Sequence, residues 1–100
     1  MAVTVEQNER GCLLRLEGEA TIFMAAELKK ALLEAVGSGR EVRVNLEGVT
    51  EVDLTALQLL WAAEREARAV GGKFSLAGGL PQEVAAALRE AGLESFPAGM

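Results

Sequence analysis

Histidine is absent from this chain of 100 residues, and cysteine occurs once, at Cys12. Without histidine, histidine-based general bases, catalytic triads and metal sites are excluded. A single cysteine forms no internal disulfide and offers no metal-binding spacing, and the apolar run around Cys12 favours a buried core residue over a reactive thiol. Walker and dinucleotide glycine fingerprints are also missing. We therefore expect no enzymatic activity, no bound metal and no cofactor.

Long apolar runs and clusters of basic residues are missing as well. No apolar stretch approaches the ~20 residues of a membrane-spanning helix, and no basic segment leads into an apolar one as in a signal peptide. Ten lysines and arginines are scattered among fifteen acidic residues, which gives a net charge of −5. Because nucleic acids and anionic membranes bind chiefly to clustered basic side chains, we expect neither partner. The chain is expected to be cytoplasmic, without direct insertion into a membrane.

Half of the residues are hydrophobic, which suffices for the core of one domain spanning residues 1–100. Alternating apolar positions predict strands at 3–6, 12–17, 42–46 and 73–77, and apolar positions at helical spacing predict helices after Thr21, from about 55 to 70, and after Pro81. Residues 47–53 are predicted to form a loop. This order predicts an α/β fold: a small mixed β-sheet of about four strands, with an N-terminal hairpin, parallel crossovers and helices packed on the sheet.

The junction before the second predicted helix is the most informative part of the chain. Thr55 and Gln58 match a capping box, S/T-x-x-E/Q, so Thr55 is a candidate helix cap, and Asp53 is a candidate for the same role. The same geometry favours an anion, because the N–H groups at a helix start are free and the helix dipole is positive there. A phosphate on Thr55 would add about −1.5 to −2 charges beside Asp53 and Glu51 and would repel a docked partner. Both interpretations stay open.

The order and spacing of motifs resemble the STAS domain family (sulfate transporter and anti-sigma-factor antagonist). The resemblance rests on LEGEA at 16–20, on VNLEGVTEVDLTALQLLWAAEREARAVGGKFSLAGG at 44–79 and on PQEVAAALREAGLESFP at 81–97. It covers nearly the whole chain. It implies a non-enzymatic STAS-like domain that binds an anti-sigma factor, an ATPase-type Ser/Thr switch kinase that also holds a sigma factor. That kinase phosphorylates a serine or threonine at the start of the second helix.

The resemblance also implies site residues. Thr55 lies at the phosphoacceptor position, with Asp53 as the neighbouring acidic residue. Leu57 and Gln58 are expected to be exposed. The residues expected to contact the partner are Thr21, Phe23, Asp53, Leu54, Ala56, Leu57 and Gln58. The chain departs from the family pattern at Leu54, which replaces a serine, and at Ala56, which replaces a glycine. Asn45 and Thr21 stand where many members have aspartate.

The variant sequence DLTALQLL at 53–60 keeps a second interpretation open. Here the chain is a constitutive STAS adapter, a subunit of a lipid-transporting ABC system or of a chemotaxis-type signalling assembly. Thr55 would then contact the partner without being phosphorylated. Trp61 allows two interpretations too, because it lies one residue off the apolar stripe of its helix: an interface anchor, or an aromatic packed under the third helix or the hairpin.

Overall fold

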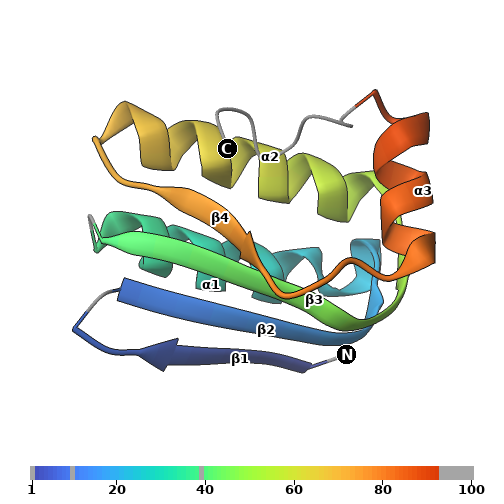
Figure 1. Cartoon of the computed structure of the whole chain (residues 1–100), viewed down its shortest axis with the longest axis horizontal. Coiled ribbons are helices and arrows are strands. Elements are labelled where there is room, and N and C mark those ends of the chain that lie inside the picture. Colours follow the sequence, from blue (N-terminus) through green and yellow to red (C-terminus); the bar gives the residue numbers. More distant parts are fainter. Residues whose placement is uncertain (1, 10, 39, 93–100) are drawn as a thin grey trace.

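The computed structural model describes residues 2–9, 11–38 and 40–92, and its centre is a mixed β-sheet (Figure 1). Within these residues the sheet has four strands in the order β1-β2-β3-β4: β1 (Ala2–Gln7), β2 (Gly11–Ala20), β3 (Glu41–Val52) and β4 (Phe74–Ala77). Strand β1 pairs antiparallel with β2, whereas β2 with β3 and β3 with β4 pair in parallel. The predicted α/β class, N-terminal hairpin and parallel crossovers are confirmed.

The helices connect the parallel strands. A 3-10 helix, η1 (Ile22–Met24), leads from β2 into α1 (Ala25–Gly37), while α2 (Leu54–Ala69) connects β3 to β4 and α3 (Gln82–Glu90) follows β4. Helix α1 packs against α2, and both run back along the sheet in the same direction, with α3 standing beside the start of α2 (Figure 1). Because both crossovers leave the carboxyl ends of parallel strands, η1 and α2 begin at the same end of the molecule.

The hydrophobic core lies between one face of the sheet and these helices. Alternate residues of β2 and β3 point into it, and Leu14 pairs with Val44 in the register of the two strands, both with no exposed surface. Leu28 of α1 and Leu60 of α2, each 1% exposed, close the core from the helix side. Cys12 is 3% exposed, so its predicted place in the core is confirmed. Each large aliphatic side chain buried here contributes roughly 1.5–3 kcal/mol.

One acidic side chain is also buried among the described residues. Glu64 of α2 is 2% exposed, and its Oε2 lies 3.2 Å from Nε of Arg68, one helical turn further on. That oxygen nevertheless accepts no hydrogen bond from the described residues, so the contact is an ion pair without hydrogen-bond alignment. The half-exposed Arg68 guanidinium therefore offsets only part of the cost of burying this carboxylate.

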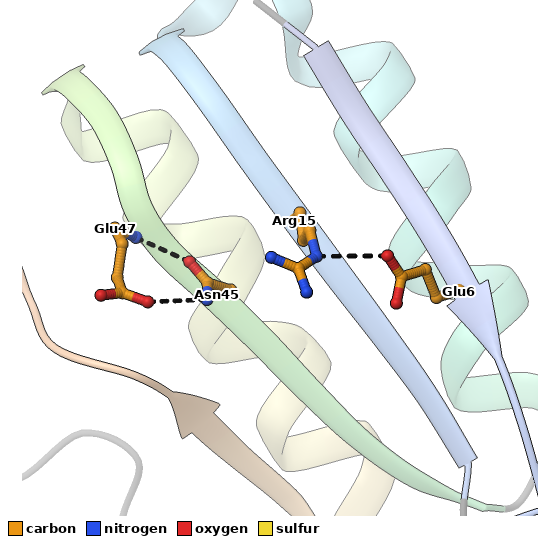
Figure 2. A network of polar contacts seen from close by, with 4 residues as sticks. All are labelled: Glu6, Arg15, Asn45 and Glu47. Carbon is orange, nitrogen blue, oxygen red and sulfur yellow. Dashed lines mark hydrogen bonds and ion pairs between the residues drawn. The ribbon is translucent and has the colours of Figure 1, made fainter.

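The opposite face of the sheet is polar. Arg15 of β2 places its Nε 3.3 Å from Oε1 of Glu6 on β1. On β3, Asn45 and Glu47 are joined by two hydrogen bonds. Figure 2 shows both pairs on this face, with the helices behind the sheet. Arg15 and Glu6 are both about half exposed. Exposed ion pairs contribute little, because water screens the charges and holding two long side chains costs entropy.

We therefore expect Glu6→Gln to change the free energy of unfolding by less than about 0.5 kcal/mol. Urea denaturation of the wild type and the variant, followed by circular dichroism, measures this difference. A loss of several times that value would show that the outer face of the sheet contributes to stability in a way that the exposed pair does not explain.

Strand β3 is longer than the sequence predicts. Residues 47–52 continue the strand, so the loop expected there is wrong. The strand continues with a shifted register against β2, since Arg15 pairs with Asn45 but Glu17 pairs with Gly48. A Cβ at Gly48 would lie 2.9 Å from Cγ of Glu17, so a larger residue at this irregularity would require the Glu17 side chain to move. The extension brings Asp53 directly to the carboxyl end of the sheet.

Candidate functional site

Asp53 caps helix α2. Its backbone is extended, and its Oδ1 accepts a hydrogen bond of 3.0 Å from the backbone N–H of Ala56. This is the ordinary N-cap arrangement, in which a short polar side chain satisfies one free N–H of the first turn. The prediction of Asp53 as a cap is confirmed. Thr55 is the second residue of the helix and not its cap, so the capping-box interpretation of Thr55 is wrong.

The second carboxylate oxygen of Asp53 joins this helix to the turn before α1. Oδ2 accepts a hydrogen bond of 2.8 Å from the backbone N–H of Ile22, and the N–H of Asp53 donates to the carbonyl oxygen of Ala20 at 3.1 Å. The bonds are reciprocal, since each segment donates once to the other. Asp53 therefore fixes the turn at residues 21–23 beside the start of α2.

Three exposed apolar side chains gather on these two segments. Phe23 is 97% exposed, Ile22 60% and Leu54 56%. We call Ile22, Phe23 and Leu54 the apolar tip. An almost completely exposed phenylalanine on a turn that hydrogen bonds hold in place has no role in the core, which makes this end of the molecule a candidate protein-binding surface.

The predicted contact residues divide into accessible and buried ones. Phe23, Leu54 and Gln58 are exposed, and Thr21, Asp53 and Thr55 are half-buried. Ala56 is 1% and Leu57 3% exposed, because both lie on the side of α2 that faces the core. The expectation that Leu57 is exposed is therefore wrong, and neither Ala56 nor Leu57 offers side-chain surface to a partner. Thr21 makes no side-chain capping bond at η1.

The hydroxyl of Thr55 forms no hydrogen bond with any described residue, since Asp53 does the capping. The first N–H groups of the helix have no partners inside it, and the dipole is positive at this end. Glu51, which is exposed, and Asp53 precede Thr55 in the chain. A group added to the hydroxyl would thus lie at the positive end of the helix dipole, on a stretch of chain that also carries two carboxylates.

Trp61 extends the exposed surface along α2. It is 41% exposed, and the guanidinium of Arg65 lies 5.0 Å from the centre of its ring, which is cation–π distance. Leu54, Gln58, Trp61 and Arg65 follow each other at helical spacing and share one face. Trp61 is therefore partly exposed, and its ring contacts a residue of its own helix.

Two hollows border α2, one at its start and one along its later turns. One lies between the start of α2 and α3, with a volume of 290 Å³ and Asp53, Leu57 and Ala91 in its lining. The other is a groove between α1 and α2 of 260 Å³. Within the described residues no group of three or more potential metal ligands gathers. Judged by length and hydropathy, no helix in the described ranges could span a bilayer.

The sequence interpretation missed Ile22 and the double role of Asp53. Helical spacing from Met24 onward leaves Ile22 and Phe23 outside the apolar stripe of α1, which is the signal that could have identified both as exposed. The bond between Asp53 and Ile22 joins residues 31 positions apart. It depends on η1 and α2 beginning at the same end of the sheet, so only the topology reveals it.

Comparison with known proteins identifies the fold and the family. The family profile described as "Mlab, STAS domain" matches residues 3–98. The anti-sigma factor antagonist SpoIIAA in its unphosphorylated form has 23% identity and a TM-score of 0.72, with 98% of this chain and 84% of that chain covered. The Bacillus cell fate determinant SpoIIAA in its phosphorylated form has 19% identity and a TM-score of 0.73, with 95% and 87% covered.

A putative anti-sigma factor antagonist from Thermotoga maritima has 18% identity and a TM-score of 0.79, with 94% of this chain and 81% of that chain covered. No curated protein matches the chain. At these identities the solved structures establish the fold, and the family profile establishes the membership.

Proposed function

The chain belongs to the STAS-domain family, and we propose that it is a non-enzymatic, cytoplasmic regulator that binds a protein partner around the start of α2 and releases it when Thr55 is phosphorylated. The observation that carries this proposal is that Asp53, and not Thr55, supplies the capping hydrogen bond of α2. Asp53 caps the helix and fixes the neighbouring turn. The hydroxyl of Thr55 therefore has no structural role in the helix cap, and Thr55 follows directly after Leu54 of the apolar tip.

A phosphate on Thr55 is compatible with the fold. The free N–H groups and the dipole at the helix start stabilise an anion there, and phosphate on a helix N-terminus creates charge-assisted hydrogen bonds. Asp53 is already engaged by two N–H donors, so the cap does not depend on the hydroxyl that is modified. Phosphorylation then changes the surface and leaves the scaffold intact.

The same phosphate opposes binding. With Glu51 and Asp53 it concentrates negative charge at the edge of the apolar tip, and a partner docked there must desolvate that charge. Like charges brought together across an interface cost several kcal/mol. An ATPase-type Ser/Thr kinase that acts as an anti-sigma factor is the partner that fits this arrangement. SpoIIAA, which shares the fold, is an anti-sigma factor antagonist known in unphosphorylated and phosphorylated forms.

A second function, the constitutive adapter, is favoured by one specific observation. The matching family profile is described as "Mlab, STAS domain", and Leu54, 56% exposed, stands where the family pattern has a serine. An apolar residue at this place adds contact area and removes one hydroxyl from the site. In this case the partner is a transporter or signalling subunit, and Thr55 is a contact residue.

Capture experiments with three baits distinguish the two functions. The wild type, Thr55→Ala and Thr55→Glu are incubated with extract of the host, bound proteins are identified by mass spectrometry, and phosphosites are mapped on the wild-type bait. We expect a kinase-like ATPase on the wild type and Thr55→Ala, at least about tenfold weaker binding to Thr55→Glu, and phosphate on Thr55. Equal capture of a transporter or signalling subunit by all three baits, with Thr55 unmodified, would contradict the phosphorylation-controlled function and support the constitutive adapter.

A further inference from the structure

We propose that the groove between α1 and α2 is the docking site for an amphipathic helix of the protein partner. This helix carries an acidic residue near the Thr55 end of the groove and a basic residue about two turns further along. The inference rests on the proposed function, because it names a part of the same partner that binds around the start of α2. It adds a second contact region, one that the apolar tip does not include.

The groove is apolar and open to solvent. Leu32 and Val36 of α1 and Leu59 and Ala63 of α2 line it, and Leu33 on its rim is 58% exposed. Its volume of 260 Å³ lies below the roughly 300–1,000 Å³ that is typical of small-molecule pockets. A shallow apolar channel between two helices instead suits a row of aliphatic side chains at i, i+3, i+4 and i+7 of a docked helix.

The groove-lining face of α2 leads back towards the proposed phosphorylation site. Leu59, Ala62 and Glu66 line it from α2, and Thr55 precedes them at the same helical spacing of four, three and four residues. Residues so spaced lie on one face of a helix. Thr55 is therefore the next position on the groove-lining face, towards the end at which η1 and α2 begin.

The two charged residues that line the groove, Lys29 and Glu66, lie towards opposite ends of it. Lys29 lies four residues into α1 and Glu66 twelve residues into α2, or about 6 Å and 18 Å from the starts of the two helices. The positive charge is thus near the Thr55 end and the negative charge about two turns further along. Neither side chain forms an ion pair with another described residue. Both charges are free to meet opposite charges on a partner.

Charge complementarity then fixes the chemistry of the occupant. An acidic residue over Lys29 and a basic residue over Glu66, about two turns apart, flank the apolar stripe of the docked helix. A phosphate on Thr55 would lie at the end of the groove that receives the acidic residue. The repulsion between these two negative groups gives phosphorylation a direct means of expelling the helix.

The first test compares capture by variants of the groove. Leu33→Glu places a charge on the apolar rim and Lys29→Glu reverses the guiding charge, and each is expected to weaken capture of the partner about tenfold or more. Lys30→Glu is the matched control, because Lys30 is an exposed neighbour on α1 that does not line the groove, and it should bind like the wild type. All three positions accept the substitution without touching the core, which unfolding in urea verifies.

The second test identifies the docked segment. A photo-crosslinking amino acid at position 33 is used with the partner that the wild type captures, and the crosslinked peptide is sequenced. The expected segment is an amphipathic helix with an acidic and a basic residue seven or eight positions apart. A synthetic peptide of this segment should bind Lys29→Glu about tenfold more weakly than the wild type, and replacing its acidic residue by lysine should restore the affinity.

Each other outcome overturns the inference. If Leu33→Glu and Lys29→Glu capture the partner normally while Phe23→Ala does not, the groove is not a docking site and the proposed function stands. If sedimentation shows a wild-type dimer that Leu33→Glu dissociates, a second copy occupies the groove. A crosslinked segment without the paired charges, or no rescue by the altered peptide, refutes the charge assignment. If the wild type captures nothing, the proposed function and this inference fall together.

Discussion

Replacing Asp53 by alanine is expected to lower the free energy of unfolding by about 2 kcal/mol. Loss of an N-cap side chain costs about 0.5–2 kcal/mol, and loss of a second, charge-assisted hydrogen bond adds on the order of 1 kcal/mol where water can reach the freed donor. Both bonds are made by the one carboxylate, at 3.0 Å to Ala56 and 2.8 Å to Ile22. The total free energy of unfolding of such domains is only about 5–15 kcal/mol, so this loss would be a large part of it.

Asp53→Asn is the graded control for this prediction. Asparagine caps helices as well as aspartate does, but its amide has only one acceptor oxygen. It therefore keeps the bond to Ala56 and loses the bond to Ile22. Urea unfolding of the three proteins should rank the wild type as the most stable, Asp53→Asn in between and Asp53→Ala as the least stable. Equal stability of wild type and Asp53→Ala would mean that the two bonds do not hold the turn and the helix together.

Replacing Phe23 by alanine is expected to weaken partner binding about thirtyfold, which corresponds to about 2 kcal/mol. Aromatic side chains that become buried at the centre of an interface are the commonest hot spots. Because Phe23 is 97% exposed in the free protein, removing its ring leaves no cavity. The free energy of unfolding should accordingly change by less than about 0.5 kcal/mol.

Val70→Ala is the matched control for Phe23→Ala. Val70 is an exposed apolar residue as well, 56% accessible, but it follows the last residue of α2, at the opposite end of the helix from Thr55. Surface plasmon resonance with the captured partner should show wild-type affinity for this variant. If Phe23→Ala binds as the wild type does, or if both variants weaken binding equally, the apolar tip is not the anchor of the interface.

The sheet was largely predictable from the sequence, because alternation and helical spacing are local signals. The strand and helix order followed from such patterns as Val42, Val44 and Leu46 on one face of β3. The extension of β3 to Val52 was not predictable, because the register shift beside Gly48 interrupts the alternation. Strand pairing across this irregularity depends on the partner strand β2, and no local pattern within residues 47–52 reports it.

The site was predictable in position but not in detail. Asp53 and Thr55 are both favoured cap residues, and only the backbone geometry decides that Asp53 is the cap. Leu57 was expected to be exposed, but the buried stripe of α2 is wide, because the helix packs against both the sheet and α1. The exposure of Ile22 and its bond to Asp53 follow from the parallel topology, which brings the ends of β2 and β3 together.

In-cell photo-crosslinking tests the central claim most directly. A crosslinking amino acid is placed at Gln58, exposed on α2, or at Glu47, exposed on the polar face of the sheet, each with Thr55 or with Thr55→Glu. We expect a crosslinked partner from position 58 with Thr55, a loss of that product with Thr55→Glu, and none from position 47. A partner crosslinked from position 47 and not from 58, or a product at 58 that Thr55→Glu leaves unchanged, would contradict a partner surface at the start of α2 under the control of charge on Thr55.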